Sequence, residues 1–238
     1  MKFDLYGDDI GTVEYVQHMG EDITVVNAAR VSFGKHKEKM DGKDKKLIKY
    51  LINHKHTSTL EHCVITYRFV VPLYVRSQHH RHRTWSYNEI SRRYTDENLR
   101  FYEPAAFRTQ SKSNRQASNL DEVNPIIYPD LSDLDFGIRA NTVIEKHHEQ
   151  SVKLYKTLMS NGVCREQARG VLPQNLYTEY YGTCNLNNLI KFINLRTHEG
   201  AQWEIQRVAQ ACLEIAEGLW PVAISSYRES MDSLKKSK

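Results

Sequence analysis

Apolar and polar positions alternate most regularly between Cys63 and Val71. The odd positions of this segment are Cys, Ile, Tyr, Phe and Val, whereas the even positions include Thr66 and Arg68. Successive side chains of a strand point to opposite faces, so this period predicts a strand with one apolar face. Pro72 follows and suits the first turn of a helix, which we predict to continue over 73–82.

Other segments carry apolar residues at three- and four-residue intervals, which indicates amphipathic helices. Asp22 precedes the first of these segments and is predicted to be its N-cap. Stop signals follow the segments at Gly34, Asn161-Gly162, Pro173 and Pro221. The predicted helices cover 23–31, 47–53, 138–159, 165–172, 186–195 and 201–219.

The remaining segments are shorter or more polar. Two alternating pieces around Gly7 and Gly11 predict a pair of strands within 3–15, and a Tyr/Thr-rich segment predicts a strand over 176–183. We predict a solvated loop over 35–46, a loop over 54–62 and a long excursion or lid over 111–129. Together, these helices and strands predict an α/β protein of the α+β type. We expect a single domain over 1–238 with a frayed tail at 230–238.

Composition excludes several classes of protein. The chain has 238 residues and a net charge of +4, which is weak for a dedicated nucleic-acid binder. Its longest apolar runs are far shorter than the ~20 residues that cross a bilayer, and its N-terminal segment lacks the features of a signal peptide. The four cysteines form no Cys-x-x-Cys pair. We therefore expect a cytoplasmic protein with reduced thiols.

The most unusual segment covers residues 78–94. It accumulates imidazole and guanidinium groups, with no acidic residue before Glu89. On an extended backbone Arg81 and Arg83 would project to one side, which matches phosphate oxygens. Trp85 and Tyr87 add flat surfaces for a ring. This composition predicts a pocket wall for an anionic aromatic ligand, which describes a nucleotide.

The pattern Arg-His-Arg-x-x-Ser-x-Asn-Glu-x-Ser-x-Arg-Tyr runs unbroken from Arg81 to Tyr94. It resembles the signature of the flavin-dependent thymidylate synthases. Further segments resemble landmarks of that family in the family's order: 28–32, 56–62, 101–104, 107–111, 168–173, 194–196 and 201–205.

This resemblance implies an activity and an assembly. The activity is the reductive methylation of dUMP to dTMP, with methylenetetrahydrofolate giving the carbon, NADPH giving the hydride and FAD mediating. The assembly is a homotetramer whose active sites combine several subunits, each with a small antiparallel sheet flanked by helices.

The resemblance also implies roles for particular residues. Arg196 matches the catalytic arginine that favours ionisation at the uracil ring nitrogen. Positions that match FAD contacts are Ser58, Arg81, His82, Arg83, Glu89, Asn185, Leu186, Asn187 and Lys191. Positions that match dUMP contacts are Gln78, His79, His80, Arg81, Glu89, Ile90, Ser91, Arg92, Arg93, Arg169 and Arg196. The residues at 187, 191 and 200 depart from those common in the family.

Two candidate nucleophiles are set aside. A serine needs a neighbouring base to attack, and Ser91 lies between Ile90 and Arg92; we expect it to position the phosphate or the uracil. None of the four cysteines follows a proline, as the motif of the cysteine-dependent thymidylate synthases requires. The flavin route needs no such cysteine.

Three alternatives stay open at this point. A metal site is suggested by the crowded histidines of 54–82, but no metal-ligand spacing is present, and we expect no metal. A module for single-stranded nucleic acid would bind with a steep salt dependence and without discriminating dUMP from dCMP. A plain flavin reductase would oxidise NADPH without responding to dUMP.

Overall fold

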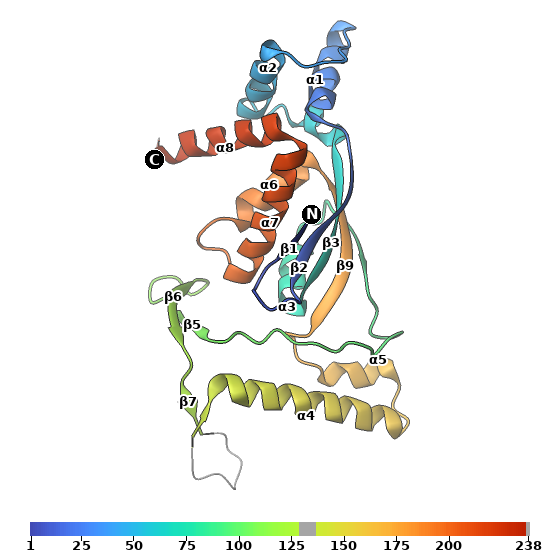
Figure 1. The fold of residues 1–238 in the computed structure, drawn as a ribbon, viewed down its shortest axis with the longest axis vertical. Helices are drawn as coiled ribbons and strands as arrows, with labels where there is room; N and C mark the ends of the chain where they lie inside the picture. The colour runs from blue at the N-terminus through green and yellow to red at the C-terminus, as the bar shows by residue number, and fades with distance from the viewer. Residues whose placement is uncertain (129–136, 237–238) are drawn as a thin grey trace.

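A five-stranded antiparallel sheet forms the centre of the protein (Figure 1). The computed structural model describes residues 1–128 and 137–236. The strands are ordered β1-β2-β3-β9-β4. Their bounds are Lys2–Asp4 (β1), Thr12–Met19 (β2), Val64–Pro72 (β3), Tyr177–Asn185 (β9) and Ser86–Glu89 (β4). The predicted N-terminal strand pair and the two predicted internal strands are confirmed.

Strand β3 buries one apolar face, as its alternating sequence predicted. Ile65, Tyr67, Phe69 and Val71 are all fully buried. They pack beneath α6 (Leu186–Arg196) and α7 (Trp203–Leu219) in one continuous core. The Tyr67 hydroxyl donates to the Cys212 carbonyl at 3.1 Å, so its one polar atom is satisfied. Burial of this apolar face fixes the sheet against the helices that carry the site.

The N-terminal helix begins differently from the prediction. In α1 (Asp22–Arg30) the N-cap is Glu21, whose amide donates to the Thr24 hydroxyl at 3.0 Å. The Asp22 carboxylate instead accepts from the amides of Val222 and Ala223, at 2.8 and 2.9 Å. Asp22 therefore satisfies the first turn of another helix, α8 (Pro221–Lys236).

Helix α8 has no counterpart in the sequence prediction, which treated Pro221 only as a break. Proline is tolerated in the first turn of a helix because that turn has no partner for its amide. The predicted tail over 230–238 is helical as far as Lys236, and residues 237–238 lie outside the described part of the chain.

The charged segment at 35–46 is only partly solvated. Helix α2 (Gly42–Asn53) begins inside it, and the Asp44 side chain is fully buried. Arg30 donates to this carboxylate at 2.6 Å, and Lys37 binds its other oxygen. Short 3-10 helices occupy Val31–Phe33 (η1) and Thr57–His62 (η2), so the predicted loop at 54–62 is partly helical.

A second group of elements lies beyond one end of the sheet (Figure 1). It contains the long helix α4 (Ala140–Ser160), α5 (Arg165–Ala168) and the 3-10 turn η3 (Arg169–Val171). The described part of the predicted excursion at 111–129 is mostly exposed and contains short strands. Strands β5 (Phe107–Gln110) and β6 (Ser118–Val123) pair with each other, as do β7 (Ile126–Ile127) and β8 (Ile138–Arg139). Pro129 lies outside the described residues.

Candidate active site

A cavity of about 510 Å³ opens where β4, β9, η3 and helix α3 (Leu73–His79) meet. Pro72 is the N-cap of α3, which ends at His79 and not at residue 82. Five of the residues predicted to bind dUMP line this cavity: Glu89, Ile90, Ser91, Arg92 and Arg169. The structure therefore brings together residues that are up to 80 positions apart.

The cavity is rich in positive charge. The half-buried Arg92 donates to the carbonyls of Glu97 and Tyr177, at 2.7 and 3.3 Å, which fixes its orientation. Arg169 is exposed. Arg76 also lines the cavity, and its Nε lies 3.2 Å from the Glu89 carboxylate. Three guanidinium groups against one carboxylate make the cavity suited to an anion.

Arg196 lies at the end of α6 and is held by two groups of the motif segment. Its Nε donates to His82 Nε2 at 3.1 Å, and its Nη2 donates to the Gln78 carbonyl at 3.1 Å. Burial, together with the charge of Arg196, lowers the pKa of His82 to about 4. His82 is therefore neutral at pH 7, and its Nε2 is free to accept from the guanidinium.

His79 is not placed where the prediction put it. Its side chain is fully buried, with Nδ1 2.8 Å from the Tyr180 hydroxyl. Its ring packs against Phe69, Trp85 and Phe192 at centroid distances of 4.8, 4.6 and 4.6 Å. Burial lowers its pKa. The His79 side chain belongs to the core beneath the site. Its neighbour His80 is half-buried and stacks on Tyr87 at 4.0 Å.

The backbone around Arg81 and Arg83 is not extended, so the argument from their two-residue spacing is wrong. The chain turns here, with the His82 amide donating to the His79 carbonyl at 2.9 Å and the Trp85 amide donating to the His82 carbonyl at 3.3 Å. Both guanidinium groups are exposed, and neither has an ion pair or hydrogen bond within the described residues. Arg93 is also exposed, 3.5 Å from Glu166.

Three other predicted flavin contacts, Asn185, Leu186 and Asn187, lie at the opposite end of α6 from Arg196. The Asn185 side chain accepts from the Asn188 amide at 2.9 Å and so caps the helix. Leu186 is buried in the core, and Asn187, which is also buried, donates to Glu61 at 3.0 Å. Ser58, on η2, and Lys191, in the middle of α6, are exposed. Of the predicted flavin contacts, only Glu89 lines the 510 Å³ cavity.

Comparison with known proteins agrees with this geometry. Residues 14–222 match the family model described as thymidylate synthase complementing protein. A flavin-dependent thymidylate synthase of Thermus thermophilus is 41% identical over 226 residues, which cover 94% of this chain and 77% of the relative. The chain belongs to the flavin-dependent thymidylate synthase family. The resemblance drawn from the motif is confirmed.

Other members of this family and a solved structure match over similar lengths. The enzyme of the same name from Kosmotoga olearia is 40% identical, with 91% of this chain and 90% of the relative covered. The crystal structure of the UMP/dUMP methylase PolB from Streptomyces cacaoi bound with 5-Br dUMP superposes with a TM-score of 0.76. It is 31% identical and covers 92% of this chain and 95% of its own.

Sequence reasoning missed Arg76 as a site residue of this family member. It lies five positions before the Arg-His-Arg motif, outside the pattern that carried the resemblance. The signal that could have found it is helical spacing. Residue 76 lies one turn after Leu73, which also faces the cavity.

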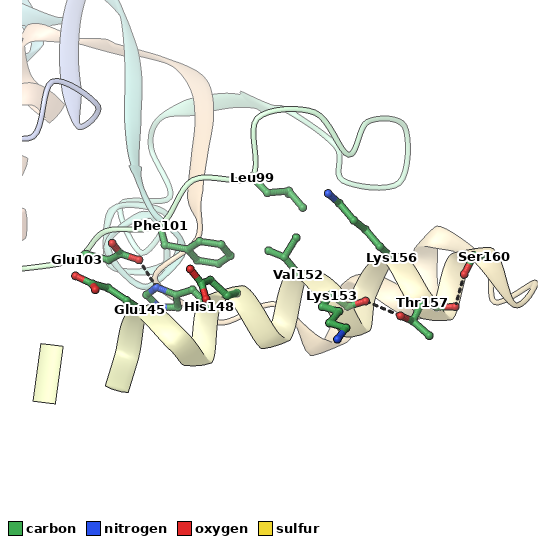
Figure 2. A pocket seen from close by; sticks show the side chains of 11 residues that line it. Leu99, Phe101, Glu103, Glu145, His148, Val152, Lys153, Lys156, Thr157 and Ser160 are labelled. Carbon is green, nitrogen blue, oxygen red and sulfur yellow. Dashed lines mark hydrogen bonds and ion pairs between the residues drawn. The ribbon is translucent and has the colours of Figure 1, made fainter. Parts of the chain in front are cut away.

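A larger cavity, of about 860 Å³, lies between the segment of Leu99–Glu103 and α4 (Figure 2). The buried His148 bridges its wall, with Nδ1 2.5 Å from Glu103 and Nε2 2.6 Å from the Asn175 amide. Phe101 stacks on the same ring at 4.4 Å. None of the residues predicted for the flavin or the nucleotide lines this cavity.

Two features are absent from the described residues. No helix among them is long and apolar enough to cross a membrane. No group of three or more His, Cys, Asp and Glu side chains in the same residues is arranged to hold a metal ion.

Proposed function

We propose that the protein converts dUMP to dTMP by reductive methylation, with methylenetetrahydrofolate as carbon donor and NADPH as reductant through bound FAD. The observation that carries the proposal is the arginine-rich cavity that Glu89, Ser91 and Arg92 of the family motif line together with Arg76 and Arg169. The similarity to a methylase bound with a dUMP analogue supports the same substrate.

In this proposal the cavity binds the phosphate of dUMP. Arg92 is already oriented by two backbone carbonyls, and Arg169 adds a second charge. The Ser91 hydroxyl accepts from the Arg93 amide at 3.3 Å, and no base contacts it within the described residues. Ser91 therefore positions the phosphate and does not attack.

Arg196 stabilises the negative charge that develops on the uracil ring. Its two hydrogen bonds, to His82 and the Gln78 carbonyl, fix the guanidinium before the substrate binds. A preoriented donor in a partly desolvated site stabilises charge without reorganisation. Attack by Cys63, Cys184 or Cys212 is disfavoured, because burial raises the pKa of Cys63 to about 12 and also raises the pKa values of Cys184 and Cys212. The exposed Cys164 does not line the cavity.

The residues present fit a flavin dinucleotide. The exposed guanidinium groups of Arg81 and Arg83 lack partners within the described residues, which suits a diphosphate. When bound, the flavin supplies the hydride chemistry between NADPH and the nucleotide. Asn185 and Asn187 lie at the N-terminal end of α6, whereas Arg196 lies at its C-terminal end, and this separation supports a homotetramer in which another subunit completes each site.

The test of this function is NADPH oxidation by the purified protein supplied with FAD, with and without dUMP. The proposal predicts oxidation that depends on dUMP. Oxidation that ignores dUMP would favour a plain flavin reductase, and binding that fails to discriminate dUMP from dCMP would favour the nucleic-acid module.

Replacing Arg76 by methionine is expected to raise the KM for dUMP roughly tenfold or more. The change keeps the length of the side chain but removes one cationic partner of the phosphate and the ion pair that orients Glu89. Steady-state kinetics measure the effect. The matched control is Arg228→Met, which breaks an exposed ion pair with Glu217 on α7. A KM equal to that of the control would remove Arg76 from the site.

Replacing His82 by glutamine is expected to flatten the pH dependence of stability. The folded pKa of His82 is about 4, below its ordinary value near 6.5. Protonation of His82 therefore favours the unfolded state. The neutral histidine stabilises the fold above pH 6.5, and this stabilisation is lost as the pH falls from 6.5 to 4. Between pH 7 and pH 5, the free energy of unfolding is expected to decrease by about 1 kcal/mol less in the variant than in the wild type. This value allows for solvent screening of a half-buried group.

Urea unfolding at the two pH values measures this difference. His54→Gln serves as the control because His54 is exposed. Equal pH dependence in the wild type and His82→Gln would show that burial and Arg196 do not lower the pKa of this histidine in the folded protein.

A further inference from the structure

Two segments that resemble family landmarks, 107–111 and 201–205, meet in a chain of hydrogen bonds that leads to the site. Arg108 on β5 donates to both carboxylate oxygens of Glu204, at 2.9 and 3.0 Å. Glu204 lies in the first turn of α7 and is buried. Gln202 donates to Glu204 at 2.9 Å, and Gln78 in turn donates to Gln202.

The carboxylate dictates which way each amide in this chain faces. An ionised carboxylate only accepts hydrogen bonds, so the Gln202 NH₂ group must face Glu204. The Gln202 oxygen then faces Gln78 and can only accept. The Gln78 NH₂ group is thereby committed to Gln202. The Gln78 side-chain oxygen is left over, and no described residue donates to it.

Gln78 lies next to the catalytic arginine. Its backbone carbonyl accepts from Arg196 Nη2 at 3.1 Å, and its side chain is half-buried. We propose that Glu204 is a positioning residue that, through Gln202, holds the Gln78 amide oxygen toward the nucleotide. There the oxygen accepts a hydrogen bond from a ribose hydroxyl. This inference rests on the proposed function and assigns Glu204 a role in substrate recognition.

The test is Glu204→Gln, with dUMP affinity measured by calorimetry. A glutamine at 204 can donate or accept, so Gln202 and Gln78 lose their fixed orientation. We expect dUMP affinity to fall roughly two- to tenfold, the loss of about one neutral hydrogen bond. The matched control is Arg108→Lys, which disturbs the ion pair but leaves the carboxylate to accept from Gln202. Its thermal stability is expected to fall while its dUMP affinity stays that of the wild type.

A second substitution distinguishes orientation from mere structural support. In the wild-type background, Gln78→Glu places a carboxylate oxygen against the Gln202 amide oxygen, and neither atom can donate. In the Glu204→Gln background Gln202 can turn, so that its NH₂ group donates to the new carboxylate at position 78. The double variant is therefore expected to bind dUMP more tightly than the sum of the single effects predicts. If Glu204→Gln does not fold, Gln202→Met replaces it as the test. This variant interrupts the chain of hydrogen bonds without burying a charge, and the same loss of dUMP affinity is expected.

The outcomes are separable. Wild-type affinity in Glu204→Gln, strictly additive effects in the cycle, or an equal loss in Arg108→Lys would each overturn the inference while leaving the proposed function intact. A wild-type protein that does not bind dUMP would overturn both.

Discussion

Replacing Arg196 by alanine is expected to lower the rate of dTMP formation by about 10²–10³-fold, since a lost charge-stabilising donor costs roughly 2.7–4 kcal/mol of barrier. The guanidinium is partly buried and fixed by His82 and the Gln78 carbonyl. The variant removes the only charge in this three-residue arrangement. The fold is expected to persist, because the residue lies at the end of α6 and outside the hydrophobic core.

The measurement compares dTMP formation with flavin retention in the same preparation. Arg207→Ala on α7 is the control, since its guanidinium donates to the Leu5 carbonyl away from the cavity. Turnover equal to that of this control would exclude Arg196 from catalysis. A loss of turnover that only follows a loss of flavin would make Arg196 a binding residue.

Replacing Phe69 by alanine is expected to lower the free energy of unfolding by about 3–5 kcal/mol. Phe69 is fully buried on β3 and packs against Tyr180 and His79 at 5.0 and 4.8 Å. Gly182 on β9 makes room for this ring, because a Cβ there would lie 2.8 Å from Phe69 Cε2. The cavity left by alanine would therefore open directly beneath the motif segment.

Urea unfolding at a fixed protein concentration measures this loss. Phe33→Ala is the control because Phe33 is 78% exposed, and its effect is expected to stay within about 0.5 kcal/mol. A loss below about 1 kcal/mol for Phe69→Ala would show that the aromatic cluster under the site can collapse without cost.

Local sequence patterns predicted the helices and strands that bury a single apolar face. The period of two in β3 and the helical periods in α2 and α7 each reflect one apolar face against one core. The errors involve long-range partners. Asp22 caps a helix that begins 199 positions later, and no local pattern distinguishes it from Glu21 as a cap for its own helix.

In the site, too, local motifs predicted some residues, whereas long-range contacts determine others. Glu89, Ser91 and Arg92 could be assigned because one motif contains them. His79 belongs to the same motif segment, yet its ring turns into the core, because α3 directs residues 78 and 79 to different sides. Arg76 and Glu204 escaped prediction because their roles depend on contacts with Glu89 and Gln202, which only the folded chain creates.

In the proposed reaction this chain transfers a carbon unit to dUMP. The direct test is to incubate the purified protein with FAD, NADPH, methylenetetrahydrofolate and dUMP, and to measure dTMP by chromatography. We expect dTMP to form, and we expect omission of dUMP, NADPH or methylenetetrahydrofolate to abolish its formation. Consumption of NADPH in the complete mixture without dTMP formation would contradict the proposed function.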